Sequence, residues 1–253
     1  SRNPDIDQLG ANKARLILLN KADLADERQT AKWQQYFEKQ GCFVVALNAR
    51  NRNSMKAING VVAEACKEKI ERDRKRGILN RPVRAMVVGI PNVGKSTFIN
   101  SFAGKACAKT GNKPGVTKGK QWIRLSKTLE LLDTPGILWP KFEDQQVGLN
   151  LALIGSMNDE ILNIEEMAVS LIQYLKDVYP LLLTKRYDLS DEAEESCKNE
   201  QDAYEVLAQI ARNRKCVLKG DEPDIRKAAA LLLDDFRSGR IGRITLESPT
   251  EQA

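Results

Sequence analysis

Two short motifs constrain this chain more than any other feature, because of the order in which they occur. Residues 20–23 read Asn-Lys-Ala-Asp, and residues 89–96, much further along, read Gly-Ile-Pro-Asn-Val-Gly-Lys-Ser. The later motif has the pattern GxxxxGK[ST] of a phosphate-binding loop. The earlier motif matches the box that reads a guanine ring in GTP-binding proteins. In the familiar GTPases the guanine box comes last, so the reversed order predicts a circularly permuted GTPase fold.

The alternation of apolar runs and helical patterns predicts a parallel α/β fold for the front of the chain. Apolar runs at 15–19 and 42–47 read as strands, and each precedes an amphipathic helical stretch. Further along we expect a strand at 83–90 before the phosphate loop and a helix at 95–103 after it. A β-hairpin is expected next, with strands at 121–125 and 128–132. From about residue 142 the strand patterns stop, and three amphipathic helices are expected instead.

This organisation predicts two domains. We expect an α/β, circularly permuted Ras-like P-loop GTPase domain over residues 1–143, followed by a small, mostly helical domain over residues 144–253. Within the first domain we expect a guanine-reading half at 1–66 and a phosphate-binding half at 83–143. A basic linker at 67–82 joins them.

The residues of the phosphate loop have separate predicted roles. Two glycines allow the backbone to curve, so that successive N–H groups at a helix N-terminus converge on phosphate oxygens. Lys95 is predicted to place its ammonium on the β- and γ-phosphates, and Ser96 to place its hydroxyl on Mg²⁺. The nucleotide-binding residues expected in this loop are Gly89, Asn92, Val93, Gly94, Lys95, Ser96 and Thr97.

A second element for the phosphate and metal is expected at residues 133–136, which read Asp-Thr-Pro-Gly at the end of a strand. Asp133 is predicted to hold Mg²⁺ through a water, and the N–H of Gly136 to sense the γ-phosphate. One threonine between the two elements must also reach Mg²⁺ when GTP is bound; Thr117 is the best candidate and Thr110 the alternative. The Gly and Pro residues around Thr117 predict a loop that orders with the γ-phosphate.

The guanine box predicts specificity for GTP over ATP. Asp23 is expected to accept two hydrogen bonds from guanine, and adenine offers no such donor pair, so ATP would leave the carboxylate unpaired. Asn20 is expected to brace the pocket, and the stem of Lys21 to cover the ring. Asn48 and Ala49 follow the next strand, in the place of the loop whose Ala N–H contacts guanine O6.

Two residues bear on the rate of hydrolysis, in which Lys95, Thr117, Gly136 and Asn92 are the expected participants. Ras-like proteins place a Gln after the Gly of this element to orient the attacking water, whereas this chain has Ile137. Slow intrinsic hydrolysis is therefore expected, with help from a partner or from elsewhere in the chain. Asn92 resembles the Asn of GTPases that bind K⁺ beside the phosphates; the alternative is that it only shapes the loop.

Composition limits the other possibilities. The chain has no His, and its five Cys never form a CxxC pair, so a zinc site is not expected and reduced thiols are. The apolar runs are far too short to span a membrane, and a cytoplasmic protein is expected. Residues 1–149 carry 27 Lys and Arg against 14 Asp and Glu, whereas residues 150–253 carry 13 against 20. A basic front half suggests a polyanionic partner.

Four segments closely resemble the ribosome biogenesis GTPase A family of circularly permuted GTPases. They are 18–23 (LLNKAD), 89–97 (GIPNVGKST), 109–115 (KTGNKPG) and 131–144 (LLDTPGILWPKFED). The resemblance covers essentially the whole chain, and Trp139-Pro140-Lys141 is more specific than the general GTPase motifs. It implies a cytoplasmic factor that binds the immature large (50S) ribosomal subunit, hydrolyses GTP during late assembly and uses its helical domain to help grip ribosomal RNA.

The RNA contacts that this resemblance implies are expected at basic segments. Residues 67–84 and 105–127 are rich in Lys and Arg, and Trp122 offers a surface on which a base can stack. A solvated linker is the alternative for 67–84. In the acidic helical domain the candidates are Arg212, Arg214, Lys215 and Lys219, with simple solvation as the alternative.

The resemblance also predicts a gap in the sheet. In the family a central strand lies between the phosphate-loop strand and the guanine-box strand, ahead of the position that matches Ser1. We therefore expect this strand to lie ahead of Ser1, outside the given sequence, and the sheet to have a gap in its place. Two other functions stay open at this point: a GTP-gated scaffold that recruits a protein partner with incidental turnover, and a trafficking GTPase, which would need a lipid anchor. A monomer is expected away from the ribosome.

Overall fold

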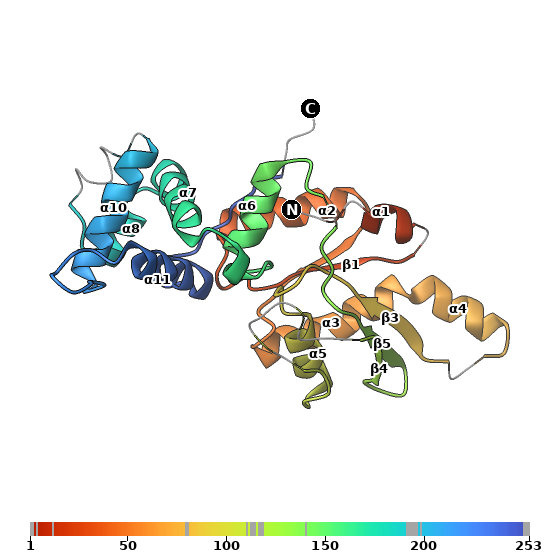
Figure 1. Cartoon of the computed structure of the whole chain (residues 1–253). Helices are drawn as coiled ribbons and strands as arrows, with labels where there is room; N and C mark the ends of the chain where they lie inside the picture. Colours follow the sequence, from red (N-terminus) through yellow and green to blue (C-terminus); the bar gives the residue numbers. More distant parts are fainter. Residues whose placement is uncertain are drawn as a thin grey trace. The chain divides into compact units, whose positions relative to one another are not determined.

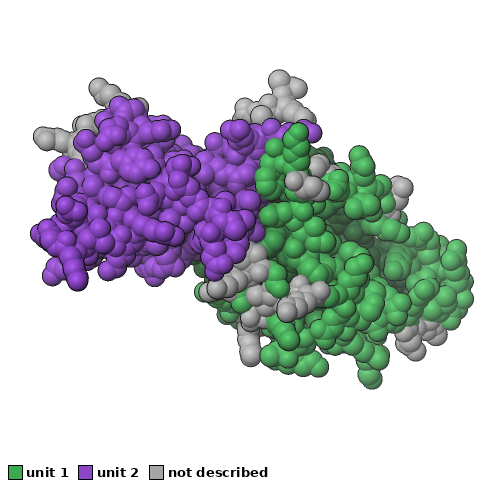
Figure 2. Space-filling model, in the orientation of Figure 1, with its two compact units in different colours: residues 1–142, 245–253 green, residues 143–244 purple. Residues whose placement is uncertain are grey.

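The structure, a computed structural model, describes residues 3, 5–11, 13–78, 81–109, 111, 115, 119–139, 141–190, 197 and 199–249. The chain divides into two compact units (Figure 2). Unit 1 comprises residues 1–142 together with 245–253, and unit 2 comprises residues 143–244. The predicted domains, 1–143 and 144–253, therefore need a correction at the end of the chain, because residues 245–253 group with the first unit.

The guanine-reading half of unit 1 contains two strands and three helices. The strands β1 (Leu16–Leu19) and β2 (Phe43–Ala46) pair in parallel. The helices are α1 (Asp5–Leu9), α2 (Glu27–Lys39) and α3 (Arg52–Ala65). Asp26 caps the N-terminus of α2, because its carboxylate accepts hydrogen bonds from the N–H groups of Arg28 and Gln29. The predicted order of strand, helix, strand and helix is confirmed.

The phosphate-binding half of unit 1 is built on a three-stranded sheet. The strands are β3 (Val83–Val87), β4 (Gln121–Arg124) and β5 (Leu129–Asp133), and the helix α5 (Lys95–Ala103) follows the phosphate loop. The strand β5 lies in the middle, parallel to β3 and antiparallel to β4. The predicted hairpin is therefore confirmed. Because this order brings the ends of β3 and β5 to one edge, the phosphate loop and Asp133 lie close together.

The predicted linker at 67–82 contains a helix, which corrects the expectation of a simple connector. This helix, α4, spans Lys67–Lys75. Opposite charges recur four residues apart along it, as in Lys67 with Glu71 and Glu68 with Arg72, and such pairs stabilise an exposed helix. Ile70 also packs against the core of unit 1. Helix formation therefore follows from the charge pattern together with one apolar contact.

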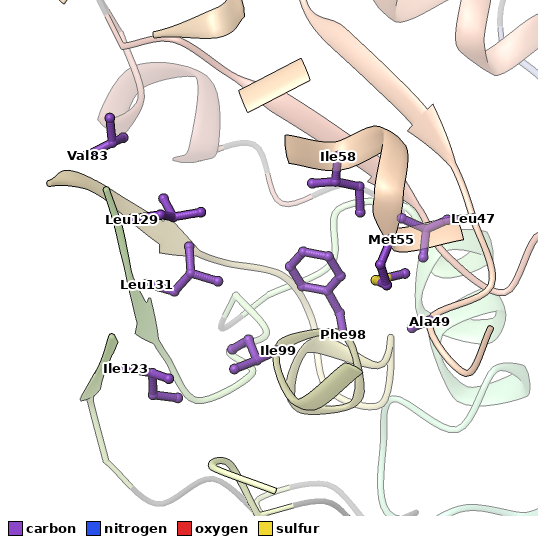
Figure 3. Packing of buried hydrophobic residues seen from close by; sticks show 10 residues of the cluster. All are labelled: Leu47, Ala49, Met55, Ile58, Val83, Phe98, Ile99, Ile123, Leu129 and Leu131. Carbon is purple, nitrogen blue, oxygen red and sulfur yellow. The ribbon is translucent and has the colours of Figure 1, made fainter. Parts of the chain in front are cut away.

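One hydrophobic cluster joins the two halves of unit 1 (Figure 3). Ile58 of α3 and Ile99 of α5 are 1% and 0% exposed, respectively. The buried members are Leu47, Ala49, Met55 and Ile58 from the guanine-reading half, and Val83, Phe98, Ile99, Ile123, Leu129 and Leu131 from the phosphate-binding half. Burial of apolar surface on this scale makes the two halves one folding unit.

The strands of unit 1 form two separate sheets, β1-β2 and β3-β5-β4 (Figure 1). Within the described residues, no strand hydrogen-bonds to both β1 and β3, so the gap predicted between these strands is present. Met86 and Val88, on and just after β3, are 58% and 49% exposed. The two halves are therefore joined by the hydrophobic cluster and by contacts at the carboxyl ends of the strands.

Unit 2 is helical, as predicted. Its elements are α6 (Gln145–Leu153), the 3₁₀ helix η1 (Asp159–Ile161), α7 (Ile164–Val178), α8 (Leu182–Tyr187), α10 (Glu200–Asn213) and α11 (Ile225–Ser238). The helices α7, α10 and α11 pack on one another. Leu171, Leu207 and Leu232, one from each, are fully buried. Among the described residues, no helix is long and apolar enough to cross a membrane.

A buried carboxylate ties the helices of unit 2 together. Asp235 of α11 accepts hydrogen bonds from Nε of Arg186, at 2.7 Å, and from the hydroxyl of Tyr187, at 3.0 Å. Nε of Arg240 donates to the same carboxylate. These bonds hold the pKa of the Asp235 carboxyl below its usual value, although burial opposes the shift.

The last described residues form a tail that packs on α2 of unit 1. The N–H of Asp26 donates to Oγ1 of Thr245 at 3.1 Å, and Nε1 of Trp33 donates to the carbonyl of Glu247 at 2.9 Å. The hydroxyl of Ser248 donates to the side chain of Gln29 at 2.9 Å. These bonds explain why the tail groups with unit 1 and not with the helical unit that precedes it.

Candidate nucleotide-binding site

The phosphate loop connects β3 to α5 and has the backbone that phosphate binding requires. Gly89 and Gly94 have φ angles of 158° and 90°, which favour glycine. Asn92 has a φ of 59°, in the left-handed region that Asn tolerates better than most residues. This conformation fits the loop-shaping role of Asn92 and leaves a K⁺ contact as a proposal.

Lys95 begins α5 and turns its ammonium back over the loop. Its Nζ donates to the carbonyl of Gly89 at 3.0 Å and to the carbonyl of Ile90 at 2.8 Å. Burial lowers the pKa of Lys95, and the nearby Asp133 carboxylate opposes that shift. The ammonium is thus held at the loop, where a bound phosphate would accept its hydrogen bonds.

Asp133 ends β5 as a buried carboxylate with one oxygen unpaired. The residue is 2% exposed, and among the described residues Oδ1 has no hydrogen-bond partner. The hydroxyl of Ser96 hydrogen-bonds to this carboxylate, and burial raises the pKa of the Asp133 carboxyl above its usual value. Carboxylate, hydroxyl and water oxygens are the ligands that Mg²⁺ prefers. Ser96 and Asp133 therefore fit the metal predicted for them.

The segment after Asp133 lies directly against the phosphate loop. The hydroxyl of Thr134 donates to the carbonyl of Val87 at 2.7 Å and fixes the start of the segment. A Cβ added at Gly136 would lie 2.7 Å from the backbone N and Cα of Pro91 and 2.8 Å from Nζ of Lys95. Only glycine fits here without a shift of Pro91 or Lys95, and sensing of the γ-phosphate by its N–H stays a prediction.

Asn20 of the guanine box joins three segments of the site. Its Nδ2 donates to the carbonyl of Val93 in the phosphate loop at 2.8 Å. Its Oδ1 accepts from the N–H of Ala49, at 2.9 Å, in the second guanine-reading loop. A Cβ at Gly94 would meet Nδ2 of Asn20 at 2.4 Å. These contacts are those that the bracing role predicted for Asn20 requires, and its part in nucleotide binding stays a prediction.

In the rest of the guanine-reading region, hydrogen bonds hold the backbone of the two loops, and two side chains of the guanine box are exposed. The N–H of Ala22 bonds to the carbonyl of Leu47, which holds the box against the end of β2. Oδ1 of Asn48 accepts from the N–H of Arg50 at 2.8 Å, so Asn48 shapes its own turn. Lys21 and Asp23 are exposed. Their contacts with a guanine ring stay a prediction.

Some predicted residues are not placed at the site. Thr117 and its alternative Thr110 lie outside the described residues. Thr97 follows Ser96 on α5 and is half-buried. Ile137, in the position of the Ras glutamine, is 64% exposed. An exposed apolar side chain has no hydrogen bond to offer a water, which agrees with the expectation of slow intrinsic hydrolysis.

Three residues near the site were missed by sequence reasoning. Pro91 backs Gly136, and Thr134 fixes the segment before it. Both lie inside recognised motifs at positions that the motif patterns leave variable. Asn100, on α5, binds the backbone of Cys107 and Ala108. No pattern marks Asn100, because its partners are fixed only by the fold.

The fold and the site define a class of protein, the phosphate-loop GTPases of the circularly permuted α/β type. A family model described as "50S ribosome-binding GTPase" matches residues 84–217. Ribosome biogenesis GTPase A of Bacillus cereus is 45% identical over 251 residues, which cover 99% of this chain and 82% of that protein. Ribosome biogenesis GTPase A of Thermotoga maritima is 32% identical, over 95% and 79%. The chain belongs to the ribosome biogenesis GTPase A family.

Solved structures agree with this assignment. A GDP-bound structure of YlqF from T. maritima has a TM-score of 0.61 at 27% identity and covers 93% of this chain and 84% of that one. A GNP-bound structure of YlqF from T. maritima gives 0.59 at 28% identity, over 93% and 82%. GTP binding and hydrolysis are the activity of this class.

Proposed function

We propose that this protein binds the immature large (50S) ribosomal subunit, promotes its late maturation and leaves when GTP is hydrolysed. The observation that carries the proposal is the contact of Gly136 with the phosphate loop, just before unit 2 begins at residue 143. A terminal phosphate sensed at Gly136 acts on the chain segment that enters the helical unit. The description of the matching family model supports the 50S particle as the partner. We place this work in the cytoplasm, with a monomer away from the ribosome.

The described residues supply most of the parts of a GTP switch. Asp23 and Ala49 read guanine, and Lys95 neutralises the phosphates. Ser96 and Asp133 would hold Mg²⁺, and we assign the third protein contribution to Thr117. When bound, the metal neutralises charge on the phosphate oxygens. The N–H of Gly136 then distinguishes GTP from GDP, because only GTP has the phosphate that it contacts.

We propose that a partner, K⁺ or both supply the catalytic group that Ile137 does not. Replacing Asn92 with Gly separates the two roles of Asn92, since glycine keeps the positive φ without the carboxamide. If Asn92 holds K⁺, the wild type hydrolyses GTP about tenfold faster in K⁺ than in Na⁺, and Asn92→Gly loses that difference. Equal rates of the wild type in the two salts would reduce Asn92 to a loop-shaping residue.

Exposed basic residues support contact with ribosomal RNA. In unit 1, Trp122 is 52% exposed, and the guanidinium of Arg84 lies 5.1 Å from its ring centroid. In unit 2, Arg212, Lys215 and Lys219 are exposed and free to reach phosphates. Arg214 differs, because it is half-buried over the ring of Tyr187 and donates to the carbonyl of Arg186. We therefore assign the RNA contact in unit 2 to the three exposed residues.

Binding to particles tests this proposal against a GTP-gated scaffold for a protein partner. The protein is sedimented with immature 50S particles in a non-hydrolysable GTP analogue or in GDP, at two salt concentrations. We expect more binding in the analogue, and a loss of about tenfold or more on going from 50 to 200 mM salt, because RNA contacts release counterions. Binding that is the same at both salt concentrations and with both nucleotides would support the scaffold and contradict the proposal.

A further inference from the structure

Asn100 makes four hydrogen bonds to two consecutive residues beyond the end of its own helix, one of them accepted by its Oδ1 from Sγ of Cys107 at 3.5 Å. Its Oδ1 accepts from the N–H of Cys107 at 2.9 Å and from the N–H of Ala108 at 2.7 Å. Its Nδ2 donates to the carbonyl of Ala108 at 2.8 Å. One half-buried carboxamide therefore fixes both polar groups of Ala108 and the N–H of Cys107.

Because Asn100 lies on α5, these bonds connect the helix that follows the phosphate loop to the segment beyond it. The same helix carries Ser96, four residues earlier and so about 6 Å along the axis. Cys107 and Ala108 pack against the core cluster of unit 1 and lie early in the connection from α5 to β4. Asn100 thus fixes this part of the connection to the helix that bears the predicted phosphate and metal contacts.

We propose that Asn100 is a positioning residue for the triphosphate state of the site. By fixing Ala108 beside α5, it sets where the chain leaves this helix on the way to Thr117, to which the proposed function assigns the third contribution to Mg²⁺. Within the described part of the chain, no hydrogen bond joins Asn100 to the guanine box, the second guanine-reading loop or the phosphate loop, so we expect binding of GDP not to need it. The inference rests on the proposed function, because it assumes that this connection contributes to the metal only with GTP.

Two substitutions of Asn100 remove its hydrogen bonds to different extents, and a substitution of the adjacent residue Ser101 is the control. Asn100→Ala removes all four bonds, whereas Asn100→Asp keeps the acceptor for both N–H groups and loses the donor to Ala108. Ser101→Ala alters the next residue of α5, which is also half-buried and has no side-chain bond to the connection among the described residues. The variants are compared for affinity of GDP and of a GTP analogue over a range of Mg²⁺ concentrations, for hydrolysis, and for amide exchange of Cys107 and Ala108 without nucleotide.

For Asn100→Ala we expect about tenfold weaker binding of the analogue, a higher Mg²⁺ requirement and about tenfold slower hydrolysis. GDP affinity should stay within about twofold, and the amides of Cys107 and Ala108 should exchange faster. Asn100→Asp should lie between, and Ser101→Ala should match the wild type. Equal losses for GDP and the analogue, or no loss for either, would overturn the inference.

Failure of the inference is distinguishable from failure of the proposed function. If particles do not bind in a nucleotide-dependent way, the proposed function fails whatever Asn100 does. If particle binding is as proposed while Asn100→Ala shows no selective loss for the analogue, only the positioning role is wrong.

Discussion

The two units each bury an aspartate, and the two carboxylates are treated in opposite ways. Asp133 of unit 1 is 2% exposed, with Oδ1 unpaired among the described residues and a raised pKa. Asp235 of unit 2 is 0% exposed, bound by Arg186, Tyr187 and Arg240, and has a lowered pKa. Burial disfavours the charge at both positions, and only Asp235 has enough donors to outweigh it.

The difference shows which carboxylate serves the fold and which serves a ligand. A buried charge that is fully paired is costly to disrupt, because its partners lose their bonds together with it. A buried charge that is left partly unpaired stays poised for a cation from outside the chain. Asp133 therefore lowers the free energy of unfolding of the nucleotide-free protein, and we expect a bound cation to offset this loss.

The largest effect is expected from breaking the paired carboxylate. Asp235→Ala leaves two guanidinium groups and a tyrosine hydroxyl without their shared acceptor, and it should lower the free energy of unfolding by about 3–5 kcal/mol. Urea denaturation of the full chain, followed by circular dichroism, measures the loss. Asp234→Ala is the control, because Asp234 is exposed and its carboxylate has Arg240 as its one ion-pair partner among the described residues; it should cost less than about 1 kcal/mol. Equal losses for both would contradict the account.

The unpaired carboxylate gives the next largest effect, on activity and not on folding. Asp133→Asn should slow GTP hydrolysis by about 100-fold or more, because Mg²⁺ loses a charged contact. Without nucleotide the melting temperature should stay the same or rise, since a buried charge has been removed. Single-turnover hydrolysis and thermal unfolding test the two halves of this prediction. A melting temperature lower by several degrees would show that Asp133 stabilises the fold.

The pH dependence of stability should have opposite signs for the two residues. The pKa of Asp235 is lowered on folding, so its stabilisation is present above the unfolded value of about 3.9 and is lost as pH falls through the folded pKa. The pKa of Asp133 is raised on folding, so the nucleotide-free protein loses stability as pH rises from the unfolded value through the folded pKa. Denaturation at several pH values, with the wild type compared with Asp133→Asn, should show the second slope only in the wild type.

The smallest effect concerns the tail on α2. Thr245→Val removes the acceptor for the N–H of Asp26, and Trp33→Phe removes the donor to Glu247; each should cost about 1 kcal/mol. Thr245→Ser keeps the hydroxyl and serves as the control. Chemical denaturation monitored on unit 1 checks both. If Thr245→Val and Thr245→Ser are indistinguishable, the hydroxyl has no part in holding the tail.

Sequence reasoning succeeded where local rules decide the structure. The strands of unit 1 follow from short apolar runs, and α5 begins at Lys95 because a glycine-rich loop leads into it. The contact of Asn20 with the phosphate loop and the closeness of Asp133 to Ser96 follow from motifs that the parallel strands bring together at one edge. The split sheet was also predicted, from the family resemblance.

Sequence reasoning failed where distant partners decide. The bond from Trp33 to Glu247 joins residues 214 positions apart, and neither sequence neighbourhood indicates it. Asn100 looks like an ordinary residue of an amphipathic helix until Ala108 is placed beside it. The charge density of residues 67–75 predicts a linker, whereas the four-residue spacing of their opposite charges favours the helix that the structure has there.

The most direct test of the whole account is the rate of GTP hydrolysis in K⁺ buffer, with and without immature 50S particles. We predict stimulation of tenfold or more, which corresponds to about 1.4 kcal/mol off the barrier, and its loss in Asp133→Asn. A rate that particles leave unchanged would contradict the switch and would favour a scaffold that turns over GTP incidentally.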